Sequence, residues 1–197
     1  MNPTRKYKVV FIGDSSVGKT CIIGRFMSGM FVNEYEATVG TDFSSKLVTD
    51  DKTKQTVQLQ IWDTAGQEKY HSLIPSYIRE SRVAVVVYDI SDRDSFNDLD
   101  EWISLVKSEE KKDVFLFLVG NKNDIGKREV TQKEALDKAD YYQCQSFETS
   151  AKENCNITEL FKAITERLCS IEPISEDSVE TVSITESNSV NTKFKCC

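Results

Sequence analysis

Runs of consecutive apolar residues alternate along this chain with stretches in which apolar positions recur every three or four residues. Residues 7–13, 83–90 and 114–120 are largely apolar throughout, a pattern typical of strands that are buried on both faces of a sheet. Residues 56–63 alternate apolar and polar positions, which predicts a strand with one wetter face. Residues 42–50 precede it and could supply its antiparallel partner.

Helical periodicity lies between and after these strands. Residues 94–109 and 157–168 each predict an amphipathic helix, and either Ser91 or Asp92 could cap the first. Strands that are separated by helices predict right-handed crossovers and a mostly parallel sheet, so the expected fold class is α/β. The apolar stripes consist of Phe96, Leu99, Trp102, Ile103 and Val106 in the first helix and of Ile157, Leu160, Phe161, Ile164 and Leu168 in the second.

The loop after the first strand carries a phosphate-binding pattern, G-x-x-x-x-G-K-[ST], at residues 13–20. Glycines allow several backbone N–H groups to converge on a phosphate, and the next helix adds the positive end of its dipole. In this pattern Lys19 reaches the β- and γ-phosphates, and the Thr20 hydroxyl ligates Mg²⁺. The nucleotide contacts expected here are Gly13, Ser15, Ser16, Val17, Gly18, Lys19, Thr20 and Cys21.

Two later loops predict that the base is guanine. The apolar run at 114–120 is followed by Asn121-Lys122-Asn123-Asp124. The Asp124 carboxylate can accept both N1–H and N2–H of guanine, whereas adenine would leave it unpaired, and such a site rejects the wrong base strongly. Further on, a backbone N–H of Ser150-Ala151-Lys152 could meet the guanine O6. Each pattern is weak alone, but their order downstream of the phosphate loop is informative.

The segment after the strand at 56–63 predicts groups for the metal and the γ-phosphate. Asp63 would hold Mg²⁺ through water, the Gly66 N–H would touch the γ-phosphate, and Gln67 would orient the attacking water as the catalytic residue. Upstream, Thr38 could give Mg²⁺ a second hydroxyl. Phe31 could pack edge-on against the guanine, or it could belong to the core.

These motifs resemble the Ras superfamily of small GTPases, and specifically the Rab family. The resemblance runs from about residue 7 to residue 168, and residues 72–90 are especially similar to the Golgi-associated Rab-six subgroup, although Thr41 departs from that subgroup. It rests on GDSSVGKT, ATVGTDF, WDTAGQEKY, NKND and ETSAK in family order. It implies a P-loop NTPase (small G protein) fold with a mostly parallel six-stranded sheet and about five flanking helices.

The resemblance also implies a function. A monomeric GTPase of this kind exchanges GTP and GDP, uses Mg²⁺, and works with an exchange factor, a GTPase-activating protein and effectors in vesicle traffic. It implies that Thr38 and Gln67 lie in the two nucleotide-sensing switches, that Tyr35 contacts the nucleotide, and that Phe43, Trp62 and Tyr77 form the aromatic patch that effectors read. No Lys or Arg lies between Phe31 and Asp42, so we expect slow unassisted hydrolysis.

Composition divides the chain into a globular part and a tail. The sequence of 197 residues has a net charge of −7, which argues against nucleic acid as the main partner. The last residues, 171–197, are rich in Ser, Thr, Glu and Asp, and this segment is expected to be disordered. The G domain is expected to comprise residues 1–170. The first residues lack the pattern of a secretory signal.

Two adjacent cysteines, Cys196 and Cys197, close the tail. In Rab proteins such a pair resembles the substrate for double geranylgeranylation, which implies an escort protein, a dissociation inhibitor and attachment to the cytoplasmic face of Golgi or related membranes. Two lipids are physically sensible because one chain binds a bilayer only marginally and the acidic tail offers no polybasic patch.

Two other functions remain open on the sequence alone. A nucleotide-loaded scaffold that never hydrolyses GTP is disfavoured by Gln67, and a P-loop ATPase or small-molecule kinase is disfavoured by Asp124. A serine, cysteine or paired-carboxylate hydrolase is not supported, since the sole histidine, His71, has no evident catalytic partners.

Overall fold

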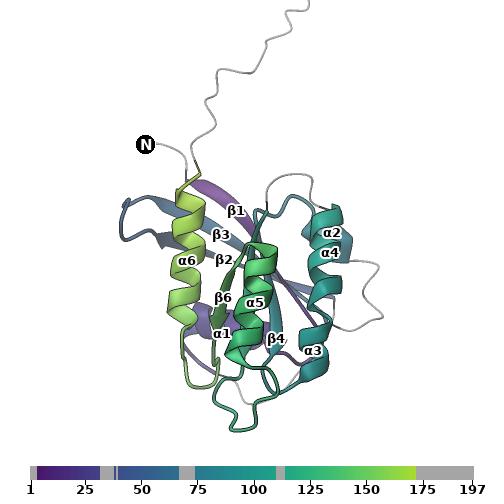
Figure 1. Cartoon of the computed structure of the whole chain (residues 1–197). Coiled ribbons are helices and arrows are strands. Elements are labelled where there is room, and N and C mark those ends of the chain that lie inside the picture. The colour runs from purple at the N-terminus through teal and green to yellow at the C-terminus, as the bar shows by residue number, and fades with distance from the viewer. Residues whose placement is uncertain (1–3, 32–37, 39, 67–73, 110–113, 172–197) are drawn as a thin grey trace, which may run out of the picture.

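In the computed structural model, the described residues are 4–31, 38, 40–66, 74–109 and 114–171. The strands are β1 (Arg5–Ile12), β2 (Thr41–Thr49), β3 (Thr56–Thr64), β4 (Val83–Asp89), β5 (Phe115–Asn121) and β6 (Gln145–Glu148). The helices are α1 (Lys19–Ser28), α2 (Ile74–Ile78), α3 (Arg93–Asn97), α4 (Leu99–Glu109), α5 (Gln132–Tyr142) and α6 (Ile157–Cys169). Helices lie on both sides of the central sheet (Figure 1).

The sheet has six strands in the order β2-β3-β1-β4-β5-β6. Every neighbouring pair is parallel except β2 and β3, which form the antiparallel pair expected from the alternating segment. The predicted mostly parallel α/β sheet is therefore confirmed. The strand order reverses at β1, and in such sheets ligands bind beyond the carboxyl ends of the strands near this point.

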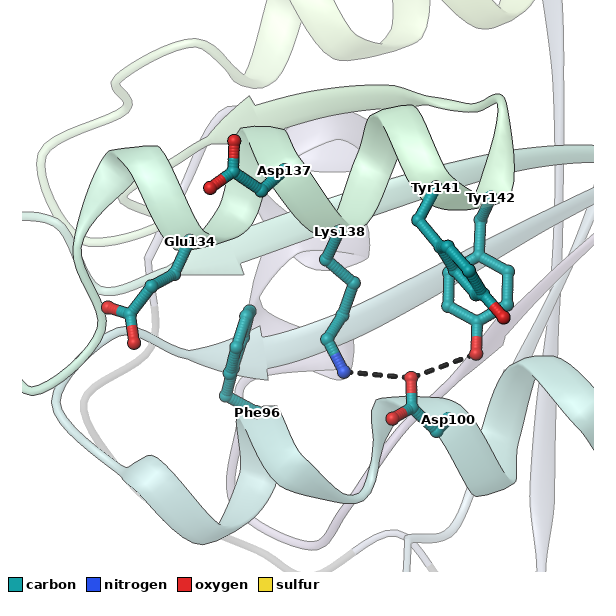
Figure 2. A pocket seen from close by; sticks show the side chains of 7 residues that line it. All are labelled: Phe96, Asp100, Glu134, Asp137, Lys138, Tyr141 and Tyr142. Atoms are coloured by element: carbon teal, nitrogen blue, oxygen red, sulfur yellow. Dashed lines mark hydrogen bonds and ion pairs between the residues drawn. The ribbon is translucent and has the colours of Figure 1, made fainter.

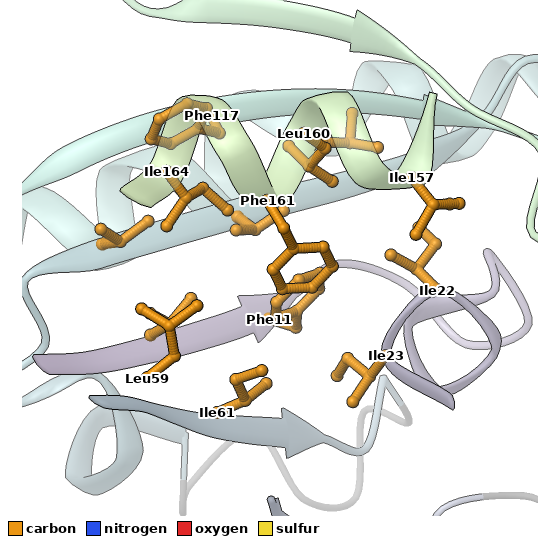
Figure 3. Close-up of a cluster of buried hydrophobic side chains, with 14 of the residues drawn as sticks. Phe11, Ile22, Ile23, Leu59, Ile61, Phe117, Ile157, Leu160, Phe161 and Ile164 are labelled. Atoms are coloured by element: carbon orange, nitrogen blue, oxygen red, sulfur yellow. The ribbon is translucent and has the colours of Figure 1, made fainter. Parts of the chain in front are cut away.

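Alternation along the strands builds a separate core on each face of the sheet. Val9 and Phe11 of β1 belong to the cluster that is shared with α1 and α6, which Figure 3 shows around Phe161. Val10 and Ile12 belong to the opposite cluster, which is shared with α2, α3, α4 and α5. With both faces covered, the central strands must be apolar on both sides, which explains their continuous apolar runs.

The predicted apolar stripes are buried, but the helix expected over 94–109 is divided at Asp98 into α3 and α4. Asp92, rather than Ser91, caps its start by accepting a hydrogen bond from the Asp94 N–H. Counting this divided stretch once gives the five helical regions that were expected. None of the helices in the described part of the chain is long and apolar enough to span a bilayer.

A hollow of about 530 Å³ lies between α5 and the divided helix, away from the ends of the central strands (Figure 2). Its wall is tied together by Asp100, which accepts hydrogen bonds from Lys138 Nζ at 2.8 Å and from the Tyr142 hydroxyl at 2.9 Å. The Lys138 ammonium also lies 4.9 Å from the centre of the Phe96 ring. These contacts fix α5 against α3 and α4 and do not involve the predicted functional loops.

Candidate functional site

The predicted phosphate loop lies between β1 and α1, with Lys19 folded over it. Lys19 Nζ donates to the carbonyl oxygens of Gly13 at 2.7 Å and Asp14 at 2.6 Å. Burial lowers the pKa of Lys19 to about 8, although the carboxylates of Asp63 and Asp14 act in the opposite direction. A polyphosphate in this loop would supply the negative charge that a buried ammonium needs.

Three oxygen-bearing side chains meet beside the phosphate loop. Thr20 Oγ1 lies 2.8 Å from Thr38 Oγ1 and donates to Asp63 Oδ2 at 2.5 Å. They come from α1, from the segment before β2, and from β3, as the sequence predicted. The arrangement brings two hydroxyls and one carboxylate to a single point.

The chemistry of this point fits a hard cation. Burial raises the pKa of Asp63, and its second oxygen, Oδ1, is buried without a hydrogen-bond partner in the described structure. A bound cation would coordinate that oxygen and offset the free-energy cost of burying the carboxylate charge. Over the described ranges, no group of three or more His, Cys, Asp or Glu side chains could hold a metal. The hydroxyls, and the phosphates of a bound nucleotide, would therefore have to complete the coordination of Mg²⁺.

Gly66 lies directly against the phosphate loop. A Cβ atom at this position would lie 2.2 Å from the carbonyl carbon of Asp14 and 2.4 Å from the Ser15 nitrogen. Only glycine allows so close an approach of two backbone segments. The Gly66 N–H is thus carried by a segment that adjoins the loop expected to hold the γ-phosphate. Gln67, the predicted catalytic residue, and Tyr35 lie outside the described residues.

The two predicted base loops are joined by a short hydrogen bond. Ser150 Oγ donates to Asp124 Oδ1 at 2.6 Å, which leaves the remaining carboxylate acceptor sites to a base. Asn121 connects these loops to the phosphate loop, since its Nδ2 donates to the Val17 carbonyl at 2.9 Å and its Oδ1 accepts from the Ala151 N–H at 3.4 Å. The loops that predict base and phosphate binding therefore form one connected site.

Lys122 has a partner that sequence reasoning missed. Its Nζ lies 2.6 Å from Asp89 Oδ2, at the end of β4. Burial acts to raise the pKa of Asp89, but hydrogen bonds from Lys122 and Ser91 outweigh it and hold this pKa below its ordinary value. Asp89 follows a buried parallel strand, and that position was a signal that could have identified it.

A second missed contact ties the phosphate loop to α4. Trp102 Nε1 donates to Asp14 Oδ1 at 2.7 Å. Burial raises the pKa of Asp14, the hydrogen bond from Trp102 opposes that shift, and the charge of Asp98 adds to it. The indole therefore serves two purposes, because Trp102 also belongs to the apolar core beneath α4.

The other predicted nucleotide contacts lie around these groups. Phe31 is partly buried and packs against the core that includes α1. Cys21 is half-buried, and burial raises the pKa of its thiol. Lys152 follows Ala151 with an exposed side chain, and its carbonyl accepts a hydrogen bond from Arg25.

The three aromatic residues expected to face effectors do lie together. The rings of Phe43 and Trp62 are 5.4 Å apart in an edge-on arrangement, and those of Trp62 and Tyr77 are 6.0 Å apart and stacked. Half of the Phe43 surface is exposed, at 49%. This patch spans β2, β3 and α2, next to the segments that bear Thr38 and Gly66.

Comparison with known protein families identifies the family of this chain. The model of the Ras family matches residues 8–170, which covers most of the chain and every loop described above.

Proposed function

The chain belongs to the Ras family, and from this premise we propose that it is a Rab-type switch that recruits effectors in vesicle traffic. As a member of the family it is a small GTPase, which binds GTP and hydrolyses it to GDP. The similarity of residues 72–90 to the Golgi-associated Rab-six subgroup supports a role at Golgi or related membranes.

One observation carries the proposal of a switch: the Thr38 hydroxyl lies 2.8 Å from the Thr20 hydroxyl. Thr20 begins α1 beside the phosphate loop, whereas Thr38 lies just before β2, the strand that bears Phe43. The position expected for the metal therefore adjoins the strand that carries part of the aromatic patch. Loss of the γ-phosphate would release Thr38 and Gly66, as in other nucleotide-driven switches.

We assign the following roles to the site. Lys19 and the backbone of the phosphate loop bind the β- and γ-phosphates, and Asp124 and Ala151 select guanine. Thr20, Thr38 and Asp63 would hold Mg²⁺, which when bound neutralises phosphate charge. Gln67 orients the attacking water. With no arginine between Phe31 and Asp42 to stabilise the transition state, hydrolysis is slow until an activating protein supplies one.

We also propose that Cys196 and Cys197 are geranylgeranylated with the help of an escort protein, and that a dissociation inhibitor and an exchange factor control membrane attachment and nucleotide loading. The support is the sequence of the tail, which lies outside the described residues. These lipids would hold the protein on the cytoplasmic face of Golgi-related membranes.

The nucleotide that the purified protein carries tests the core of this proposal. We expect chromatography of the denatured protein to release GDP or GTP in about one equivalent. An empty protein or one that carries adenine nucleotides would refute the assignment, and the latter would favour an ATPase or kinase. Single-turnover phosphate release from the GTP-loaded protein then separates a GTPase from a scaffold that never hydrolyses.

A further inference from the structure

Arg25 of α1 uses every nitrogen of its guanidinium group as a donor, and two of them reach across to the predicted base loop. Its Nε donates to the Ala151 carbonyl at 2.8 Å, and its Nη2 donates to the Lys152 carbonyl at 2.7 Å. The remaining nitrogen, Nη1, donates to the Gly29 carbonyl at 2.7 Å. Three backbone carbonyls, from two segments more than a hundred residues apart, are thus held by one planar cation.

The same side chain also packs over the ring of Phe31. The Arg25 guanidinium carbon lies 5.8 Å from the centre of the Phe31 ring, within the range of a cation–π contact. Gly29 is the C-cap residue of α1, and because its carbonyl accepts a hydrogen bond from Arg25 Nη1, this side chain also holds the chain where the helix ends. Arg25 therefore contacts both the predicted base loop and Phe31.

Both backbone polar groups of Ala151 are held by side chains from other elements. Its N–H points to Asn121 Oδ1 at 3.4 Å, and its carbonyl accepts from Arg25. Asn121 connects the loop to Val17 of the phosphate loop, whereas Arg25 connects it to the second half of α1. These two attachments fix the orientation of the backbone that we expect to meet the guanine O6.

We propose that Arg25 is a positioning residue for the guanine site, which clamps the loop at 150–152 onto α1 so that the Ala151 N–H and Asp124 are pre-oriented for the base. This inference rests on the proposed binding of guanine nucleotide. Arg25 makes no contact with the phosphate loop among its hydrogen bonds, so its effect falls on nucleotide retention and not on hydrolysis. Pre-organised contacts of this kind are made before the ligand arrives and mainly slow its release.

Arg25→Lys tests the clamp. A lysine ammonium keeps the charge but cannot present three donors in a plane to three separate carbonyls. We expect GDP to dissociate about tenfold faster from the variant, which corresponds to the loss of one charge-assisted hydrogen bond. The rate constant for single-turnover GTP hydrolysis should stay within about twofold of the wild type.

Arg167→Lys is the matched control. Arg167 of α6 has its guanidinium carbon 4.3 Å from the centre of the Phe115 ring of β5. The change therefore alters an arginine–aromatic contact of the same kind away from the base loops. This control should retain GDP as the wild type does. Equal acceleration in both variants would show a general loss of stability and overturn the inference, as would an Arg25→Lys protein that retains GDP normally.

A second ligand separates positioning from simple destabilisation. The diphosphate of 2-aminopurine riboside lacks both the O6 acceptor and the N1–H donor of guanine, so the Ala151 N–H has no partner on the base and Asp124 loses one of its two. We expect Arg25→Lys to change its affinity less than about twofold, against about tenfold for GDP. An equal effect on both ligands would overturn the inference. If the wild-type protein itself retained no guanine nucleotide, the proposed function would fail first, and the two failures are thus distinguishable.

Discussion

Asp124 meets the expected base with one oxygen already engaged. Ser150 Oγ donates to its Oδ1, and an asparagine in its place would keep that bond because its amide oxygen also accepts. The asparagine NH₂ group, however, cannot accept from guanine N1–H and N2–H, but it can donate to the O2 of xanthine. We predict that Asp124→Asn shifts the preference from guanine to xanthine nucleotides by at least about a hundredfold.

Competition between GTP and xanthosine triphosphate measures that shift. Asp137→Asn provides the control, because it makes the same change in charge at an exposed position of α5. The control should prefer GTP as the wild type does. If Asp124→Asn retained full preference for guanine, this carboxylate would not be the group that reads the base.

Gly13 occupies a position that no other residue can take. Its φ is +132°, and a Cβ atom there would lie 2.1 Å from the Val87 carbonyl oxygen of the adjacent strand β4. We predict that Gly13→Ala lowers the free energy of unfolding by about 3 kcal/mol or more, as measured by urea denaturation, because both backbone strain and overlap oppose it.

Gly24 gives the matched control for that substitution. It lies within α1, and a Cβ atom there would meet nothing within 4 Å. Gly24→Ala should therefore raise the free energy of unfolding, by about 0.5–1 kcal/mol. A Gly13→Ala protein as stable as the wild type would show that the turn after β1 can adopt another path.

At the residue scale, the sequence predicted the groups that would touch a ligand but not the groups that hold them. Motifs define loops with required chemistry, so Lys19 and Asp124 could be identified from local spacing. Trp102 and Arg25 act across separations of 88 and 126 residues, through contacts that exist only in the folded chain. Local sequence did not indicate these roles. Trp102 belongs to an apolar stripe, which predicts only core packing, and an arginine on an amphipathic helix is usually solvated.

Among the elements, α5 is attached to the start of α3 by a network centred on Glu134. Its carboxylate binds Arg93, with Oε1 to Nη1 at 2.7 Å, and completes a capping box with Thr131. The hydrogen bonds from Arg93 and Thr131 lower the pKa of Glu134 to about 2, from an ordinary 4.5. The charged form of Glu134 is thus favoured in the folded state.

The sign of the resulting pH dependence follows directly. A lowered pKa contributes stability that is fully present above about pH 4.5 and is lost as the pH falls toward 2. We predict that Glu134→Gln melts below the wild type at neutral pH, and that the difference in Tm shrinks toward zero between these two values. Glu101→Gln makes the same change at an exposed position of α4, and this control should melt close to the wild type at neutral pH.

Periodicity predicted the positions of the central strands and of α6, but it did not predict the break between α3 and α4. The stripe at 94–109 predicted one helix because its apolar spacing is continuous, and spacing does not report the backbone at Asp98. The antiparallel strand β2 was predictable because it directly precedes an alternating strand. The order of the parallel strands was not predictable, because pairing between distant segments depends on how the helices pack on the two faces of the sheet.

For the whole molecule, the two cores hold one rigid sheet, and the groups expected to sense nucleotide all lie at one end of it. Lys19, Thr20, Asp63 and Gly66 follow directly from α1 and β3, which pack into the core shared with α6. The aromatic patch of Phe43, Trp62 and Tyr77 adjoins the same segments. A change at the phosphates therefore has a short path to an effector surface, and the body of the domain need not move.

Membrane attachment is proposed to be independent of that switch, because the predicted nucleotide contacts lie within residues 13–152 and the cysteine pair lies at 196 and 197. Serine cannot form the thioether that holds a geranylgeranyl chain, and the acidic tail offers no substitute attraction to anionic lipid. We predict that Cys196→Ser combined with Cys197→Ser leaves the rate of GDP dissociation unchanged. In cell fractionation, the same double variant should move from Golgi-containing membrane fractions to the cytosol. Cys144→Ser, which alters a half-buried thiol between α5 and β6, should remain on membranes. Continued sedimentation of the double variant with membranes would mean that another surface, and not these lipids, carries the attachment.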